Sequence, residues 1–139
     1  MDLALTRPHL HATSPPLILL DTNALLWLHR GDSRAAALTG RGARLYASPA
    51  SMLELQFLCE SGRLRLRRGA SIAQLIHDEH WVLDDPSSAE WFEKATEVGW
   101  ARDPFDRLLV AHARLRRWRL ATGDRGLIER LAAGECVAL

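Results

Sequence analysis

The sequence is poor in cysteine, which secreted and zinc-binding small domains need for their stability. Its 139 residues include two cysteines, Cys59 and Cys136, and they do not stand at the spacing of metal ligands. Two cysteines do not make the disulfide framework of a small secreted domain. We therefore expect both to be reduced, buried, small apolar residues of a cytosolic protein.

Long hydrophobic runs are missing as well. The run Leu17–Leu20 stops at Asp21, and every other run is also far shorter than the about 20 residues that cross a bilayer. The N-terminus lacks the basic and apolar segments of a secretory signal peptide. We expect no membrane span, no secretion and a cytoplasmic location. Residues 1–16 contain three prolines and no sustained periodicity, so they are expected to be a poorly ordered leader.

The rest of the chain alternates strand-like and helix-like segments. With 47% hydrophobic and 25% charged residues, it has the composition of one globular domain, expected over residues 17–139. Short apolar runs predict strands at 17–20, 45–48, 81–83, 118–122 and 136–139. Helical spacing predicts helices at 22–30, 33–38, 48–61, 71–77, 88–98, 103–115 and 124–132. This alternation predicts an α/β sandwich with a central, mainly parallel sheet flanked by helices.

Four acidic residues stand where strands are followed by helices. Asp21 ends the first strand, Asp124 follows the strand at 118–122, and Asp106 lies in the first turn of its helix. Glu54 lies in the helix after the second strand. In open α/β sheets the carboxyl ends of the strands form one crevice, so these side chains should converge. Such a cluster of carboxylates is tolerable only with bound protons or hard cations.

An all-oxygen ligand set selects Mg²⁺ or Mn²⁺ over zinc. Such an ion leaves room for water and for the phosphate oxygens of a substrate. It supplies a nucleophilic hydroxide and neutralises charge in the transition state. The reaction that these residues imply is phosphodiester hydrolysis.

Each acid also has a structural interpretation, which stays open at this point. Asp124 and Asp103 are well placed to cap the helices that follow them. Asp106 would complement a helix dipole. Asp21 suits capping and catalysis equally. Glu54 is harder to explain structurally, because a carboxylate among apolar neighbours is costly unless it is paired or liganded.

Together these segments resemble the PIN-domain family, and within it the toxins of VapBC-type toxin–antitoxin pairs. Four motifs carry the resemblance, in order and in spacing: Leu19–Trp27, Ser51–Leu55 with Gly62–Leu64, Asp103–Ala111 and Leu120–Asp124. It extends over about residues 17–139. It implies an α/β sandwich, an Mg²⁺ or Mn²⁺ site, endoribonuclease activity, a cognate antitoxin protein and a homodimer.

The resemblance also implies roles for individual residues. Asp21 and Asp106 would be the principal metal ligands, with Glu54 and Asp124 completing the catalytic site. Second-shell or accessory residues would be Thr22, Asn23, Asp103 and Thr122. Two departures from the family pattern are the leader and His112, which stands where that helix often has a small or amide residue.

Two other functions remain as alternatives. A phosphatase of the haloacid-dehalogenase type uses an aspartate after its first strand, but it needs a second aspartate two residues later, where this chain has Asn23. The other alternative is a catalytically silent PIN-like module that binds RNA or protein. The presence of all four acids argues against the loss of a catalytic site that this alternative assumes.

The basic residues are almost all arginine: of 18, only Lys94 is lysine. Arginine suits phosphate binding, although a GC-rich genome produces the same bias. The segments 63–68 and 107–119 carry arginines without acids, and a basic rim of this kind would hold an RNA backbone. The candidate RNA-binding residues are Arg107, Arg114, Arg116 and Arg117, although Arg107 could instead form an ion pair with Asp106.

Tryptophans and histidines give weaker indications. Trp27 and Trp118 are expected in the core, whereas one or more of Trp81, Trp91 and Trp100 could be exposed for base stacking or for a partner. The histidines at 29, 77, 80 and 112 show no pairing in the sequence that suggests a metal site or a catalytic triad. They are interpreted as structural or surface residues.

Overall fold

The N-terminal boundary of the fold lies close to the expected one. The computed structural model describes residues 14–40 and 42–139, so residues 1–13 of the expected leader lie outside the described residues. Pro16 already takes part in the fold, because its carbonyl oxygen accepts a hydrogen bond from the backbone N–H of Arg44 at 2.9 Å. Among the described residues, no helix has the length and apolarity needed to cross a membrane.

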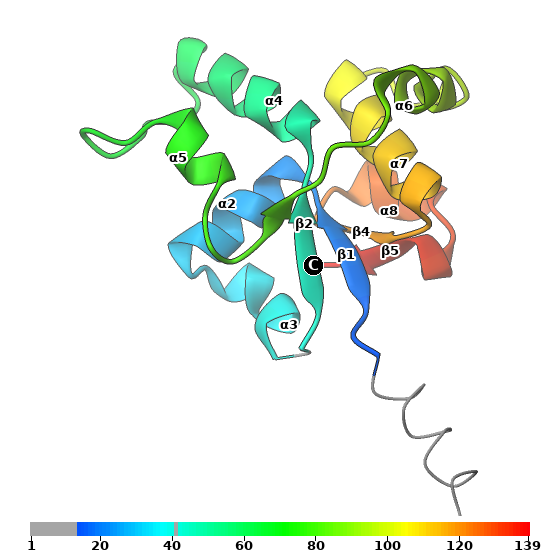
Figure 1. Cartoon of the computed structure of the whole chain (residues 1–139), viewed down its shortest axis with the longest axis horizontal. Coiled ribbons are helices and arrows are strands. Elements are labelled where there is room, and N and C mark those ends of the chain that lie inside the picture. Colours follow the sequence, from blue (N-terminus) through cyan, green and yellow to red (C-terminus); the bar gives the residue numbers. More distant parts are fainter. Residues whose placement is uncertain (1–13, 41) are drawn as a thin grey trace, which may run out of the picture.

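The strands form one parallel sheet (Figure 1). They are β1 (Leu17–Leu20), β2 (Arg44–Ala47), β3 (Val82–Leu83), β4 (Arg119–Thr122) and β5 (Cys136–Ala138), in the order β3-β2-β1-β4-β5. Every neighbouring pair is parallel, which confirms the predicted α/β architecture. β1 lies at the centre, and its last three residues are 0% exposed. A parallel strand covered on both faces must be apolar throughout, which explains the sequence of this segment.

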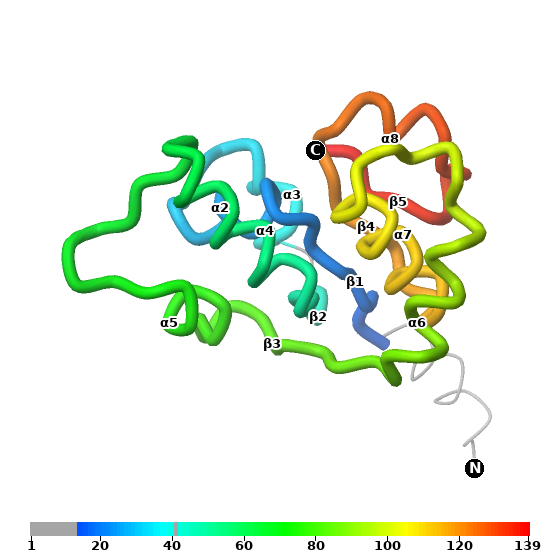
Figure 2. Tube along the Cα trace, turned by 90° about the horizontal axis from the view of Figure 1, so that it is seen from above, coloured from blue at the N-terminus to red at the C-terminus, as the bar shows by residue number. Residues whose placement is uncertain are grey.

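Helices cover both faces of the sheet (Figure 2). They are α2 (Thr22–Arg30), α3 (Ala36–Thr39), α4 (Pro49–Glu60), α5 (Ile72–Ile76), α6 (Ser88–Ala95), α7 (Pro104–Arg116) and α8 (Arg125–Arg130), with 3₁₀ turns η1 (Ser33–Ala35) and η2 (Ala133–Glu135). Successive residues of β1 alternate between two cores. Ile18 packs with Leu25 of α2 and Leu55 of α4, whereas Leu19 packs with Leu109 of α7.

Side-chain caps explain why helices follow the strands at once. Asp21, Ser48, Asp103 and Asp124 each accept a hydrogen bond from a backbone N–H in the first turn of α2, α4, α7 and α8. Gly31, with φ of 68°, ends α2 in the left-handed conformation that glycine adopts most easily. The predicted helix starts were therefore set by local chemistry.

The segment from Arg63 to Arg67 alternates with period two, as strands do, but it is a loop between α4 and α5. Leu64 is buried and Leu66 is partly buried, while the arginines of the segment are exposed. The alternation thus reflects a loop that presses its leucines against the core, and not a member of the sheet.

The expectation for the tryptophans holds in part: Trp27 and Trp118 each pack against one of the two cores, but Trp81 and Trp91 are not exposed. Trp27 and Trp118 are only partly buried, whereas Trp81 and Trp91 are each 5% exposed. The Trp81 indole N–H donates to the carbonyl of Ile76 at 2.9 Å. The two buried indoles thus lie in different cores, Trp81 with the residues of α2 and α4 and Trp91 with those of α7.

The cysteines are both free, as expected, but their burial differs. Cys136 is buried in β5. Cys59 is only partly buried, because it lies near the end of α4, where that helix extends past the sheet.

Candidate active site

Asp21 stands at the carboxyl end of the central strand. Its backbone N–H donates to the carbonyl of Ala121 at 3.0 Å, which ties it to β4, and its Oδ1 accepts from the N–H of Ala24 at 2.7 Å. The side chain is held in place by this cap, and the residue is 5% exposed. Asp21 therefore caps α2 and also lies at the sheet edge where ligands of α/β proteins bind.

Asp124 and Asp103 are caps as well. Asp124 Oδ1 accepts from the N–H of Leu127 at 3.1 Å, and its own N–H donates to Thr122 Oγ1 at 3.0 Å. Asp103 Oδ1 accepts from the N–H of Phe105 at 2.7 Å. Both aspartates are exposed, so the capping contacts orient them while solvent reaches their carboxylates.

Glu54 has a hydrogen-bonding partner that the sequence did not reveal. The hydroxyl of Thr22, in the first turn of α2, donates to Glu54 Oε1. That hydroxyl also lies 2.9 Å from Ser51 Oγ. Since Thr22 gives its single proton to Glu54, Ser51 donates to Thr22. Both hydroxyl residues are buried, and this chain of hydrogen bonds fixes Glu54 in an otherwise apolar helix.

Thr22 thus donates to Glu54, and Thr122 accepts from the backbone N–H of Asp124. Ser51 was missed, although a serine three residues before an acid inside an apolar helix is a visible signal. Asn23 is exposed on the first turn of α2.

Asp106, in the first turn of α7, shows the strongest electrostatic effect. Burial, and after it repulsion from other acids, raise the pKa of its carboxyl from 3.8 to about 7. In decreasing order, those acids are Asp103, Asp124, Glu54 and Asp21. The carboxyl groups predicted from the sequence to converge are therefore brought within electrostatic reach of one another.

Asp21 and Glu54 respond in the same direction. Burial, with a smaller contribution from the charges of Glu54 and Asp124, raises the pKa of Asp21 to about 6, although the hydrogen bonds of Thr122 and Ala24 lower it. Burial also raises the pKa of Glu54, with a smaller contribution from Asp103, while the Thr22 hydroxyl lowers it. The raised pKa values mean that burial and mutual repulsion disfavour the ionised form of these carboxyl groups.

The donor set fits a hard divalent cation. The converging side chains offer oxygen atoms alone, and their mutual repulsion is what a bound cation relieves. Within residues 14–40 and 42–139, no three His, Cys, Asp or Glu side chains are close enough to hold one ion as they stand. A bound ion would therefore have to draw carboxylates together or keep waters among its ligands, as Mg²⁺ usually does.

The arginines proposed for RNA are mostly engaged elsewhere. The guanidinium of Arg107 donates to the carbonyls of Ala101 and Gly99, so its predicted alternative pairing with Asp106 is wrong. Arg114 pairs with Glu135 at 2.9 Å, and Arg116 pairs with Asp84 at 2.8 Å. Arg117 is exposed and ends α7 with φ of 61°.

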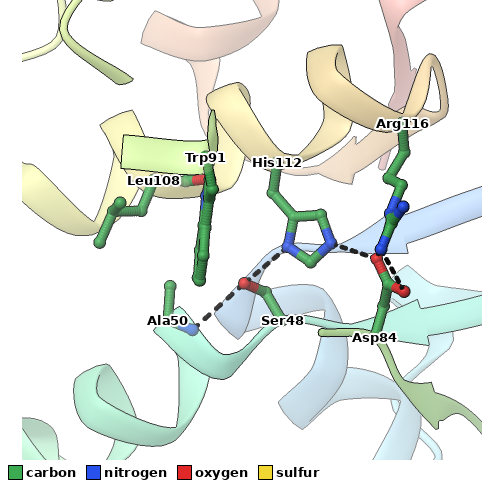
Figure 3. A network of polar contacts seen from close by, with 7 residues as sticks. All are labelled: Ser48, Ala50, Asp84, Trp91, Leu108, His112 and Arg116. Carbon is green, nitrogen blue, oxygen red and sulfur yellow. Dashed lines mark hydrogen bonds and ion pairs between the residues drawn. The ribbon is translucent and has the colours of Figure 1, made fainter. Parts of the chain in front are cut away.

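His112 has partners that sequence reasoning missed. Its Nδ1 lies 2.9 Å from Ser48 Oγ, and its Nε2 lies 2.7 Å from Asp84 Oδ2 (Figure 3). Ser48 and His112 are both 0% exposed, so no substrate reaches this serine and it is not a nucleophile. The three residues lie far apart in the chain, and nothing in their local sequence indicates the contact.

The comparisons with known proteins agree with this architecture. The family model of the PIN domain matches residues 18–134. A toxin–antitoxin complex from Klebsiella pneumoniae contains a similar chain, at 17% identity and a TM-score of 0.61, covering 87% of this chain and 96% of that one. VapBC2 from Rickettsia felis, bound to a DNA fragment from its promoter, is similar at 17% identity and a TM-score of 0.62, covering 88% and 98%.

FitAcB from Neisseria gonorrhoeae has 22% identity and a TM-score of 0.50, covering 88% of this chain and 96% of that one. At these identities the likenesses establish the fold. No curated protein matches the sequence.

Proposed function

The chain belongs to the PIN domain family, and from that membership we propose that it is a metal-dependent endoribonuclease, the toxin of a type II toxin–antitoxin pair. The observation that carries the proposal is the placement of Asp21, Asp106 and Asp124 at the starts of α2, α7 and α8, where burial and four neighbouring acids raise the pKa of Asp106. A fold needs no such cluster for its own stability. Perturbed carboxyl groups at the ligand-binding edge of a parallel sheet are characteristic of catalytic sites.

Asp21 and Asp106 are proposed as the principal ligands of Mg²⁺ or Mn²⁺. Glu54 and Asp124 complete the set. Thr22 and Thr122 act on these acids through hydrogen bonds to the Glu54 carboxylate and the Asp124 backbone, and Ser51 supports Thr22 by a bond to its hydroxyl. Asp103 has an accessory role: it caps α7 and its charge raises the pKa of Asp106.

When bound, the cation would activate a water molecule and neutralise charge on the phosphate under attack. The protein's own contribution is to hold oxygen ligands in place before the substrate arrives. Asp106, with a pKa of about 7, holds a proton for part of the time at neutral pH. That proton must leave when a cation takes its place, so cation binding should release protons.

A protein partner is supported by the exposed apolar side chains. Leu53 and Phe57 of α4 are 64% and 53% exposed, and Phe92 of α6 is 55% exposed. We assign such surface to a cognate antitoxin and to a second copy of this chain. Since three of the four proposed RNA-binding arginines form bonds within the protein, Arg117 and the exposed arginines of the 63–68 loop are the better candidates for contact with RNA.

The test is cleavage of a mixed RNA pool by purified protein in Mg²⁺, Mn²⁺ or EDTA. We expect cleavage that needs the divalent ion and that disappears in Asp21→Asn. The matched control is Asp32→Asn, which makes the same chemical change at a cap of η1 that takes no part in the acid cluster. Equal cleavage by wild type and Asp21→Asn would show a contaminating nuclease.

The alternative is a catalytically silent module that binds RNA or protein. It is favoured by the spacing of the acids, since no three metal-binding side chains of the described residues are close enough to share an ion as they stand. A folded, antitoxin-free protein that binds RNA, yet cleaves none in either metal, would establish this alternative.

A further inference from the structure

A sealed polar network lies outside the acid cluster, between the helices that carry Glu54 and Asp106 (Figure 3). His112 of α7 bridges Ser48 Oγ, 2.9 Å from Nδ1, and Asp84 Oδ2, 2.7 Å from Nε2. The guanidinium of Arg116 donates hydrogen bonds to both carboxylate oxygens of Asp84, at 2.8 and 3.2 Å. Arg116 stands one helical turn after His112, so one face of α7 presents both groups.

The hydrogen-bonding inventory defines the state of the imidazole. Ser48 Oγ already accepts from the N–H of Ala50 at 3.2 Å, so its own proton is free to go to His112 Nδ1. The Nε2–H of His112 then donates to Asp84. A neutral imidazole in this one tautomer satisfies every group, in agreement with burial lowering the pKa of His112.

The imidazole is closed off from solvent. Trp91 of α6 packs edge-on against it, with ring centroids 5.2 Å apart, and donates its indole N–H to the carbonyl of Leu108 at 2.8 Å. His112 is 0% exposed. A substrate therefore cannot reach the imidazole, and its effect must be exerted through the elements it joins.

Those elements are the start of α4 and the middle of α7. Ser48 is the cap from which α4 begins, and Asp84 is anchored to the end of β2 through its N–H, which donates to the carbonyl of Ala47 at 2.9 Å. The same helices meet again where Phe57 faces Phe105, with centroids 6.2 Å apart.

The two contacts bracket the acids along both helices. In α4, Glu54 lies between Ser48 and Phe57. In α7, Asp106 lies between Phe105 and His112. The distance between the Glu54 and Asp106 carboxylates therefore depends on both contacts between the helices. Of the two, the hydrogen bond between His112 and Ser48 is directional, whereas the contact between the phenylalanine rings is not.

We propose that His112 is a positioning residue: by fixing the cap of α4 against α7, it sets the separation of the Glu54 and Asp106 carboxylates for the divalent cation. This inference rests on the proposed function, because it assumes that these acids bind the ion. Nothing about it requires His112 to touch metal or RNA.

The experiment compares His112→Gln with His112→Asn. A glutamine amide reaches the position of Nε2 and can keep the bond to Asp84, but it offers nothing to Ser48. An asparagine places its amide near the position of Nδ1 and can keep the bond to Ser48. Both variants remove a buried ring from the same site, so a purely structural role would affect them alike.

The readout is binding of Mn²⁺ without RNA, measured from the electron paramagnetic resonance signal of free Mn²⁺. We expect His112→Gln to bind about 10-fold more weakly, and to need correspondingly more Mn²⁺ for half-maximal cleavage. His112→Asn should retain most of the affinity. Ser48→Ala serves if either variant fails to fold: it removes the bond to His112 together with the cap bond from the N–H of Ala50, and its Mn²⁺ affinity should match that of His112→Gln.

Unchanged Mn²⁺ affinity in His112→Gln, or in Ser48→Ala where the first does not fold, would overturn the positioning role while leaving the nuclease intact. Equal weakening in both His112 variants would reduce the residue to a space-filling one. A wild-type protein that neither binds Mn²⁺ nor cleaves RNA would overturn the proposed function, and the positioning role with it.

Discussion

Two groups of polar side chains follow different strands of the same parallel sheet, and their electrostatics are opposite. In the acid cluster, burial and mutual repulsion raise the pKa of Asp106 to about 7 and that of Asp21 to about 6. In the histidine network, burial acts to raise the pKa of Asp84, but hydrogen bonds from Arg116 and His112 outweigh it, and the pKa is lowered.

The difference separates two uses of buried charge. The network satisfies each of its members within the protein, so it contributes to the stability of the fold. The acid cluster leaves like charges facing one another, so it opposes folding unless protons or a cation compensate. A cluster of like charges that does not stabilise the fold is therefore a better indicator of a functional site than a network whose members are all paired.

The largest expected effect is that of Asp106→Asn. Removing this charge should lower the rate of metal-dependent cleavage by about 10²-fold or more, because it takes away a proposed metal ligand without leaving a cavity. Unfolding by urea in EDTA should show that stability is unchanged or increased, since repulsion is relieved. A clear loss of stability would mean that Asp106 belongs to a satisfied network after all.

The opposite result is expected for Asp84→Ala. This change leaves the buried Nε2–H of His112 and the guanidinium of Arg116 without their acceptor, and should lower the free energy of unfolding by about 1–3 kcal/mol. The control is Asp85→Ala at the exposed neighbouring position, for which a change within about 0.5 kcal/mol is expected. Equal changes in the free energy of unfolding in the two variants would show that the network does not stabilise the fold.

The pH dependence of stability should follow the acid cluster. The unfolded chain releases the protons of Asp21 and Asp106 near their ordinary value of 3.8, whereas the folded protein keeps them to about 6 and about 7. The unfolded state therefore binds fewer protons between these values, and stability should fall as the pH rises from about 4 to about 7.

Thermal unfolding in EDTA across this range measures the slope. Asp106→Asn should flatten it, and saturating Mn²⁺ should stabilise the protein more at pH 8 than at pH 5, because the ion competes with protons. A wild-type slope of the opposite sign would show that other groups dominate the titration.

The smallest effect is expected next to the network but outside it. Arg117 adopts φ of 61°, a conformation that glycine enters without steric cost. Arg117→Gly should raise the free energy of unfolding by up to about 1 kcal/mol and leave Mn²⁺ binding unchanged. Destabilisation would assign a stabilising contact to the Arg117 side chain.

The sequence could predict what depends on neighbours along the chain. Caps such as Asp21 and Asp103, the left-handed Gly31 and the apolar run of β1 are local signals, and they located most helices and strands. The convergence of the acids followed from one topological rule, since parallel strands carry their ends to one edge.

It could not predict contacts between distant segments. Ser48, Asp84 and His112 are brought together by packing alone, and the same holds for the ion pair between Arg114 and Glu135. The burial of Trp81 also depends on such a contact, since its indole N–H donates to the carbonyl of Ile76.

The central place of β1 has a consequence during protein synthesis. Although it is the first strand to be made, β1 pairs with β4, whose residues follow Asp106 in the chain. The ribosome adds about 5–20 residues per second, so β1 waits for seconds before its second neighbour exists. Asp106 is made shortly before β4 and Asp124 directly after it, so a chain that terminates before α7 carries only Asp21 and Glu54 of the acid cluster.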